Sequence, residues 1–205
     1  MLLSDICVVI IAYLLGSVSF SIVTAKLSKG IDIRQHGSGN AGATNTLRVL
    51  GKGPAIAVLV LDILKGVLAV VIAKWIIPDL SSWVPAASAL AAICGHTWPI
   101  FFGFKGGKGV ATTAGVMLTL NFVPALIAFV IAIIIMAITR YVSVGSIIGT
   151  ALIPLLMWLN GTDSTEILLA TLVFVLVTFR HRSNLVKLMN GTENKLGARK
   201  TGEQS

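Results

Sequence analysis

Seven runs of apolar residues dominate the chain, and short polar segments separate them. The runs cover residues 3–25, 54–77, 83–102, 110–120, 122–139, 143–160 and 164–180. All but one are long enough for a helix to cross a bilayer, which takes roughly 17 to 25 residues. The run at 110–120 is too short, because a helix of that length rises only about 16 Å. The pattern predicts an all-α polytopic membrane helix bundle with seven spans, whose short fourth span is tilted, shielded by protein or re-entrant.

The composition supports a membrane protein. Hydrophobic residues make up 56% of the chain and charged residues only 12%, which is more apolar than the core of a soluble domain requires. Since 205 residues are nearly used up by the spans, we expect one transmembrane domain over residues 1–205. The remaining segments are interpreted as cytoplasmic loops at about 26–53, 103–109 and 139–143 and a cytoplasmic tail at 181–205.

The positions of Lys and Arg indicate the orientation, because basic residues near span ends stay on the cytoplasmic side. All except Lys65 and Lys74 lie in or beside these loops and the tail. We therefore expect the N-terminus outside and the C-terminus in the cytoplasm, provided that the short run at 110–120 is a crossing. The net charge of +8 favours anionic lipid head groups over nucleic acid, because the basic residues are spread out and lack interleaved aromatic residues.

Three polar clusters interrupt the apolar pattern at the expected cytoplasmic side, and the first is Gly37–Asn45, followed by Arg48. Small residues let the backbone approach a ligand and turn its N–H groups inward. The hydroxyls of Ser38 and Thr44 and the guanidinium of Arg48 are suited to phosphate oxygens. A flexible connector is the simpler alternative, although such linkers rarely carry two Asn residues.

The second cluster, Gly106–Gly109, directly precedes the short apolar run. The free N–H groups and the positive dipole end of the next helix, together with Lys108, would attract an anion. The cluster is not a nucleotide-binding P-loop, because Phe102 stands where that motif needs Gly, and Gly109 stands where it needs Ser or Thr. By itself the cluster fits equally well a loop whose lysines only set the orientation.

The third cluster contains His181 and Asn184, which are one helical turn apart and can face the same neighbour. His181 can move a proton near neutral pH or donate to an oxyanion, but a lone interfacial His is also common as a structural residue. Asp62 and Lys65 lie inside the second span at i, i+3 spacing and are interpreted as a structural ion pair. No metal site is expected, because the three His residues lack ligand spacing.

These motifs, in this order, resemble the bacterial integral-membrane glycerol-3-phosphate acyltransferases that use acyl phosphate as donor. The resemblance covers nearly the whole chain. The matching segments are Gly37–Asn45 with Arg48, Lys105–Thr112, Arg140–Ser143, His181–Leu185 and Gly191–Lys195.

The resemblance implies acyl transfer from acyl phosphate to the 1-hydroxyl of glycerol 3-phosphate. The products are 1-acylglycerol 3-phosphate and phosphate, at the first step of phospholipid biosynthesis. The residues it marks as catalytic are Ser38, Arg48, Lys108, His181 and Asn184. Those it marks as substrate-binding are Gly37, Gly39, Asn40, Gly42, Thr44, Asn45, Gly106, Gly107, Gly109 and Ser143.

Several chemical alternatives stay open at this point. His181 is either a general base or a group that only positions the acceptor, while the donor phosphate takes the proton. A covalent acyl-Ser38 is a further route, although the sequence contains no visible Ser-His-acid arrangement. No cofactor or metal is expected, and no nucleic acid.

The expected partners are the two substrates, membrane lipid and, by functional coupling, an enzyme that makes acyl phosphate. The expected location is the bacterial inner membrane, with the active site on its cytoplasmic face. A small transporter of a phosphorylated solute is the alternative, but it would place its polar elements near the bilayer midplane. A structural membrane scaffold is a third interpretation.

Overall fold

The computed structural model describes residues 2–78 and 83–197, and all regular structure among them is helical. The longer helices are α1 (Leu2–Ser17), α4 (Lys52–Ile76), α5 (Val84–Thr97), α6 (Val110–Leu120), α7 (Phe122–Thr139), α8 (Val142–Leu159) and α9 (Ser164–Arg180). The shorter ones are α2 (Phe20–Lys29), η1 (Ile33–Gln35), α3 (Ala43–Leu50), η2 (Ile100–Phe102) and α10 (Arg182–Met189). The all-α prediction is confirmed.

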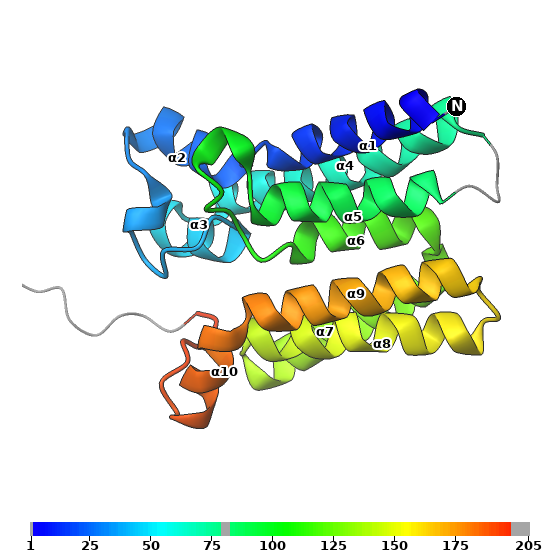
Figure 1. Cartoon of the computed structure of the whole chain (residues 1–205). Coiled ribbons are helices and arrows are strands. Elements are labelled where there is room, and N and C mark those ends of the chain that lie inside the picture. Colours follow the sequence, from blue (N-terminus) through cyan, green and yellow to red (C-terminus); the bar gives the residue numbers. More distant parts are fainter. Residues whose placement is uncertain (1, 79–82, 198–205) are drawn as a thin grey trace, which may run out of the picture.

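The long helices run side by side in two groups (Figure 1). The N-terminal helix group consists of α1, α4, α5 and α6, and the C-terminal helix group consists of α7, α8 and α9. The short helices α2, α3, η2 and α10 gather at one end of the bundle, called the polar end below. The start of α1 and the turn between α8 and α9 lie at the opposite end. The expected cytoplasmic loops therefore all come to the polar end.

By length and composition, the described residues contain five helices able to cross a membrane. Three of them are the single helices α4, α7 and α8. The other two are joined helices, α1 with α2 and α5 with η2. The pair α9 and α10, bent by 56°, adds a sixth if it forms one span. Helix α6 is too short to qualify. None of its residues is exposed, so protein covers most of its surface. Of the three alternatives for the fourth run, partial shielding by protein agrees with this burial, and its crossing of the membrane stays a prediction.

Two segments depart from the expected pattern of uninterrupted span and plain loop. The first span breaks at Val18 and Ser19, and the carbonyl of Val18 accepts a 2.7 Å hydrogen bond from the buried ammonium of Lys65. A buried cation needs oxygen partners, and the break exposes one. The expected loop 26–53 folds into η1 and α3, and the expected tail contains α10. Arg199 and Lys200 of that tail lie outside the described residues.

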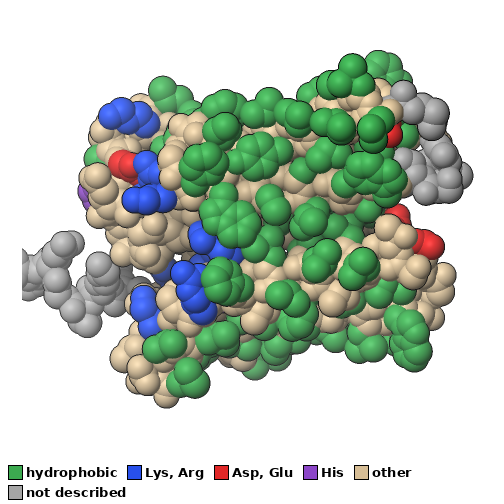
Figure 2. All heavy atoms as spheres, viewed as in Figure 1, with side chains coloured by type: hydrophobic (Ala, Val, Ile, Leu, Met, Phe, Trp, Pro, Cys, Tyr) green, Lys and Arg blue, Asp and Glu red, His purple; other side chains and the backbone are tan. Residues whose placement is uncertain are grey.

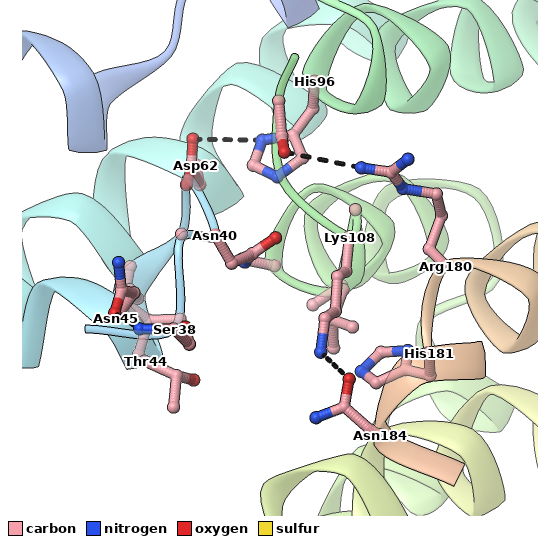
Figure 3. Close-up of a pocket in the computed structure, with 18 of the residues that line it drawn as sticks. Ser38, Asn40, Thr44, Asn45, Asp62, His96, Lys108, Arg180, His181 and Asn184 are labelled. Atoms are coloured by element: carbon pink, nitrogen blue, oxygen red, sulfur yellow. Dashed lines mark hydrogen bonds and ion pairs between the residues drawn. The ribbon is translucent and has the colours of Figure 1, made fainter. Parts of the chain in front are cut away.

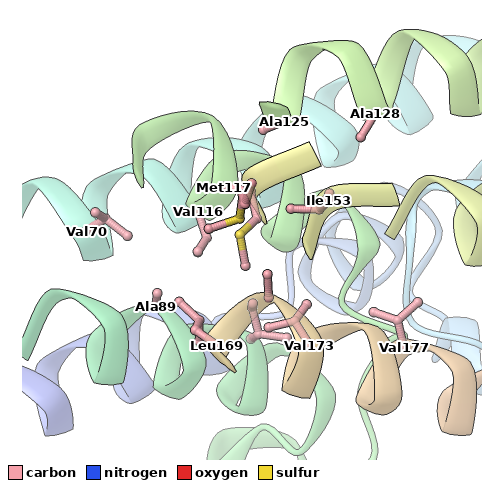
Figure 4. Packing of buried hydrophobic residues seen from close by; sticks show 13 residues of the cluster. Val70, Ala89, Val116, Met117, Ala125, Ala128, Ile153, Leu169, Val173 and Val177 are labelled. Atoms are coloured by element: carbon pink, nitrogen blue, oxygen red, sulfur yellow. The ribbon is translucent and has the colours of Figure 1, made fainter. Parts of the chain in front are cut away.

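Glycines allow the closest helix pairs to form. At Gly16, α1 packs directly against α5, and a side chain there would collide with the backbone of Ala92. Gly66 and Gly115 likewise bring α4 and α6 into backbone contact. Small residues are the usual means of close helix packing in membranes. Between the two groups lies the main apolar cluster, which includes residues from α4 to α9 such as Val116, Val173 and others labelled in Figure 4.

Candidate functional site

The polar end contains a cavity of about 1260 Å³. The Lys and Arg side chains on the face shown in Figure 2 gather toward this end, whereas hydrophobic side chains cover most of the rest. Residues from all three polar clusters line the cavity: Ser38, Gly39, Asn40, Gly42, Thr44, Arg48, Gly106, Lys108, Gly109, His181 and Asn184. Clusters that are far apart in the sequence therefore form one site.

Two sides of the cavity face each other in Figure 3. Ser38 and Thr44 lie on one side, on the loop before α3 and at its first turn. Lys108, His181 and Asn184 lie on the other side, where the start of α6 meets the end of α9. The first turns of α3 and α6 both line the cavity, so two positive helix ends reach it.

The first loop is held in shape by Asn45. Its side-chain amide donates to the carbonyls of Ile33 (3.1 Å) and His36 (3.0 Å), and its Oδ1 accepts from the backbone N–H of Ser38 at 2.8 Å. The residue is only 1% exposed. Asn45 thus supports the loop and also lines the cavity, and its direct binding of substrate stays a prediction.

Glycine is needed at Gly37 for two reasons. Its φ of +63° lies in the left-handed region, and Oδ1 of Asn45 fills the space that a Cβ would occupy. Gly37 does not line the cavity, in contrast to the neighbouring Ser38 and Gly39. Its role is to turn the chain so that Ser38 faces the cavity.

The loop before α6 uses its glycines differently from the prediction. The N–H of Gly106 donates to the carbonyl of Thr97 at 3.2 Å, and that of Gly107 donates to the carbonyl of His96 at 3.1 Å. Both N–H groups therefore face α5, and the binding of substrate by Gly106 and Gly107 stays a prediction. Lys108 and the first turn of α6 line the cavity and bring positive charge to it.

Lys108 points across to α10. Its ammonium donates to Oδ1 of Asn184 at 2.5 Å. Burial lowers the pKa of Lys108 to about 8; Glu193 opposes this effect, and the positive charges of Arg48 and Arg180 add to it. The charged form of Lys108 is destabilised by burial and by the positive charges near it, so a bound anion would stabilise it strongly.

His181 sits at the bend between α9 and α10. Its Nδ1 lies 2.8 Å from the carbonyl of Val177, an arrangement in which Nδ1 donates and Nε2 is left as an acceptor. Burial, together with the positive charge of Lys108, lowers the pKa of His181 to about 4, although the bond to Val177 opposes the shift. The imidazole is therefore neutral near pH 7.

Glu193 was not singled out from the sequence, yet it supports this side of the cavity. Its Oε1 accepts from the side-chain amide of Asn184 at 2.6 Å and from the hydroxyl of Ser143 at 3.1 Å. Ser143 is 2% exposed and does not line the cavity, so in this structure it acts on Glu193, and its binding of substrate stays a prediction. The available signal was a carboxylate in a tail that is otherwise mostly basic.

The cavity continues into an apolar groove between α4, α6 and α7. Its walls are hydrocarbon side chains, which include Leu59, Ile63, Ala114, Leu118, Phe129, Val130 and Ile133. Leu59, Val130 and Ile133 are also exposed on the outer surface of the bundle. The groove is thus in contact with the region that lipid would occupy, and it leads to the cationic side chains.

A buried charge cluster borders the cavity, and two of its members, Asp62 and His96, line it. Lys65 and Asp62 form the expected ion pair, with 2.8 Å between Nζ and Oδ1, and the prediction is confirmed. His96 adds a third polar group, because its Nδ1 lies 3.5 Å from the same oxygen. Figure 3 shows this contact between His96 and Asp62.

Comparison with known proteins gives a consistent result. A family model described as glycerol-3-phosphate acyltransferase matches residues 6–191. The protein of that name from Halalkalibacterium halodurans is 56% identical over 197 residues, which cover 94% of this chain and 95% of the relative. The one from Shouchella clausii is 52% identical over 201 residues, which cover 96% and 98%.

Two solved structures are also similar to this chain. Both are crystal structures of PlsY, described as an integral membrane glycerol 3-phosphate acyltransferase. The glycerol 3-phosphate form gives a TM-score of 0.90 at 43% identity, and the lysophosphatidic acid form gives 0.88 at 42%. In each case the similarity covers 95% of this chain and 96% of the other.

Proposed function

Because this chain belongs to the glycerol-3-phosphate acyltransferase family, we propose that it transfers the fatty acyl group of an acyl phosphate to the 1-hydroxyl of sn-glycerol 3-phosphate. The products are 1-acylglycerol 3-phosphate and inorganic phosphate. Family membership favours this enzyme over a transporter or a scaffold.

One observation carries the choice of donor: a single cavity joins a cationic polar end to an apolar groove. An acyl phosphate has a doubly charged head and a hydrocarbon tail, and the cavity offers a matching environment for each. Glycerol 3-phosphate, which has no tail, needs only the polar end. Two phosphates close together require several positive groups to offset their repulsion.

The cations that face the cavity are suited to that role. Arg48 on α3 offers a planar fork for phosphate oxygens, and Lys108 offers a point charge. The positive ends of α3 and α6 add backbone N–H groups. Ser38, Asn40 and Thr44 would orient the polar groups of the substrates, with Gly39, Gly42 and Gly109 allowing close approach of the backbone.

We propose direct attack of the glycerol hydroxyl oxygen on the acyl carbonyl carbon. A new ester bond forms, the bond between that carbon and the phosphate oxygen breaks, and phosphate leaves. Nε2 of His181 accepts a hydrogen bond from the attacking hydroxyl. Since the pKa of His181 is about 4, the imidazole is a weak base, and the hydroxyl proton passes to the departing phosphate.

Positioning and charge neutralisation then account for most of the catalysis, because the acyl group is already activated. In the alternative route, Ser38 would first form an acyl ester. Its hydroxyl has no hydrogen-bonded imidazole or carboxylate among the described residues, so the activation that such a nucleophile requires is missing. A burst of acylated Ser38, or ping-pong kinetics, would contradict direct transfer.

The chain is a multi-pass membrane protein, and for its topology we propose seven crossings in one domain over residues 1–205, counting α6. The polar end would face the cytoplasm of a bacterial cell, with the N-terminus outside the inner membrane and the C-terminus inside. The support is the concentration of Lys and Arg at this end. An enzyme that produces acyl phosphate would be the functional partner.

The test uses purified protein with labelled glycerol 3-phosphate and either acyl phosphate or acyl-CoA as donor. We expect product with acyl phosphate and at least about 100-fold less with acyl-CoA. In Lys108→Ala, the loss of the central cation should lower kcat/KM by about 1,000-fold, because a preorganised charge at the reacting phosphate is removed.

Lys52→Ala is the matched control, because Lys52 is exposed at the polar end but does not line the cavity. It should retain wild-type kcat/KM. Equal turnover with acyl-CoA would overturn the assignment of the donor. Wild-type turnover by Lys108→Ala would overturn the assignment of the site.

A further inference from the structure

Arg180, the last residue of α9, reaches across to the loop that carries Lys108. Its Nη2 donates to the carbonyl of Gly107 at 3.2 Å and lies 3.5 Å from the carbonyl of Gly106. The guanidinium also lies over the ring of Trp98, 5.9 Å from its centre. Figure 3 shows Arg180 among the residues that line the cavity, with its guanidinium reaching toward the side where His96 lies.

The loop carbonyls face Arg180 because the N–H groups of the same loop face the other way. Gly106 and Gly107 donate to the carbonyls of Thr97 and His96 at the end of α5. A Cβ on Gly106 would collide with the carbonyl of His96, and one on Gly107 would collide with the imidazole of His96. The loop is therefore sandwiched between α5 and the guanidinium of Arg180.

This contact joins the two helix groups where the site lies. The loop belongs to the N-terminal helix group, and Arg180 ends a helix of the C-terminal group. The second polar link at this place is the bond from Lys108 to Asn184. Without Arg180, two partly buried carbonyls lose their partner, and that single link remains between the loop and the C-terminal helix group.

From this geometry, we propose that Arg180 is a positioning residue for the acyl transfer: it fixes the Gly106–Gly107 turn against α9 so that the Lys108 ammonium stays at the phosphate position. The inference rests on the proposed function. Arg180 acts through the loop, because its Nη2 is directed at the carbonyl oxygens of Gly106 and Gly107. A displacement of about 1 Å in a catalytic group can cost about 100-fold in rate.

Arg180 also sets the charge around Lys108, which gives a readout that a purely structural residue would not affect. The charged and titratable groups near this ammonium are Glu193, Arg48, Arg180, Lys187 and His181. The positive charge of Arg180 lowers the pKa of Lys108, so its removal should raise that pKa. Since charged Lys108 would bind the phosphate, KM for glycerol 3-phosphate should rise in the wild type as the pH passes about 8, the pKa of Lys108. In Arg180→Met this rise in KM should begin at a higher pH.

The experiment compares full-length Arg180→Met, Arg180→Lys and wild type in kcat, KM and backbone hydrogen exchange. We expect Arg180→Met to lower kcat/KM by about 10- to 100-fold, mainly through kcat, and to speed up exchange in residues 104–109. Arg180→Lys keeps a donor and a charge, and should recover about a third or more of wild-type kcat.

Lys74→Met is the matched control. Lys74 also donates to a backbone carbonyl of another helix, that of Thr119 at 3.3 Å, but at the opposite end of the bundle. It should keep the kinetic constants, the pH profile and the exchange of residues 104–109. A loss in Lys74→Met as large as that in Arg180→Met would attribute the effect to general packing and overturn the proposal.

Two further outcomes would overturn it. One is unchanged exchange of residues 104–109 in Arg180→Met, and the other is faster exchange with unchanged kinetic constants. If the wild type makes no product from acyl phosphate, the proposed function fails separately. The exchange comparison then decides alone whether Arg180 holds the loop.

Discussion

The two glycine-containing loops of the cavity look alike in sequence but are held by different means. The first, Gly37–Asn45, is fixed from within: Asn45 bonds three backbone groups between Ile33 and Ser38. The second, Gly106–Gly109, is fixed from outside, by carbonyls of α5, by Arg180 and by Asn184. The first loop therefore depends on one side chain, whereas the second depends on how the helices pack.

This difference predicts different sensitivities. Loss of the single support of the first loop should disrupt it as a unit. Loss of any one support of the second loop should displace Lys108 by a limited amount, because the others remain. Three measurements test the comparison.

The largest effect is expected from Asn45→Ala. It leaves one N–H and two carbonyls without their partner, and each buried unpaired group costs about 1–3 kcal/mol. We expect kcat/KM to fall by at least about 100-fold and the thermal midpoint to fall by several degrees. Steady-state kinetics and a thermal melt in detergent measure both.

Asn190→Ala serves as the control for Asn45→Ala, because Asn190 is an exposed Asn at the end of α10. It should match the wild type. If Asn45→Ala keeps activity within about threefold of wild type, the first loop does not depend on this side chain and the comparison fails.

A smaller effect is expected from Glu193→Ala, which removes an outer support of the second loop. The amide of Asn184 then loses its acceptor and no longer holds Oδ1 toward Lys108. We expect kcat/KM to fall by about 10- to 100-fold, with less change in the thermal midpoint than in Asn45→Ala. The same two assays apply.

Ser143→Ala refines this prediction. It removes only one of the two donors to Glu193, so a loss of no more than about threefold is expected. A loss in Ser143→Ala as large as that in Glu193→Ala would show that Ser143 has a separate contact with substrate.

The smallest effect is a pH dependence. Lys108 is charged below its pKa of about 8 and neutral above it, so phosphate affinity is highest at low pH and is lost as the pH rises. KM for glycerol 3-phosphate should rise about fourfold between pH 7 and 8.5. The measurement is a set of initial rates across this range.

Lys108→Arg keeps its charge throughout that range, and its KM should stay flat even if its kcat is lower. Glu193→Gln should shift the rise to lower pH, because the negative charge that raises the pKa of Lys108 is gone. An unchanged profile in Lys108→Arg would assign the titration to another group.

The helices and the three clusters could be predicted from the sequence, because apolar run length and the position of basic residues are local properties. The runs at 110–120, 122–139 and 164–180 coincide with α6, α7 and α9. The i, i+3 spacing was enough to pair Asp62 with Lys65. Local spacing fixes such contacts because both partners lie on one helix.

What the sequence did not predict depends on partners far along the chain. Asn45, Gly106 and Ser143 have residue types that suit phosphate, but in the fold their polar groups are bonded to the protein itself. The role of Glu193 depends on Asn184 and Ser143, the latter 50 positions away. The break after α1 likewise depends on Lys65 of another helix.

The groove beside α4, α6 and α7 has a consequence for how the enzyme should be assayed. Leu59, Val130 and Ile133 both line it and face outward, so a long-chain donor would enter sideways from its own leaflet and its product would leave by the same path. The concentration that governs turnover is then the mole fraction of donor in the membrane or micelle. Adding inert detergent at constant total donor should slow the reaction by surface dilution.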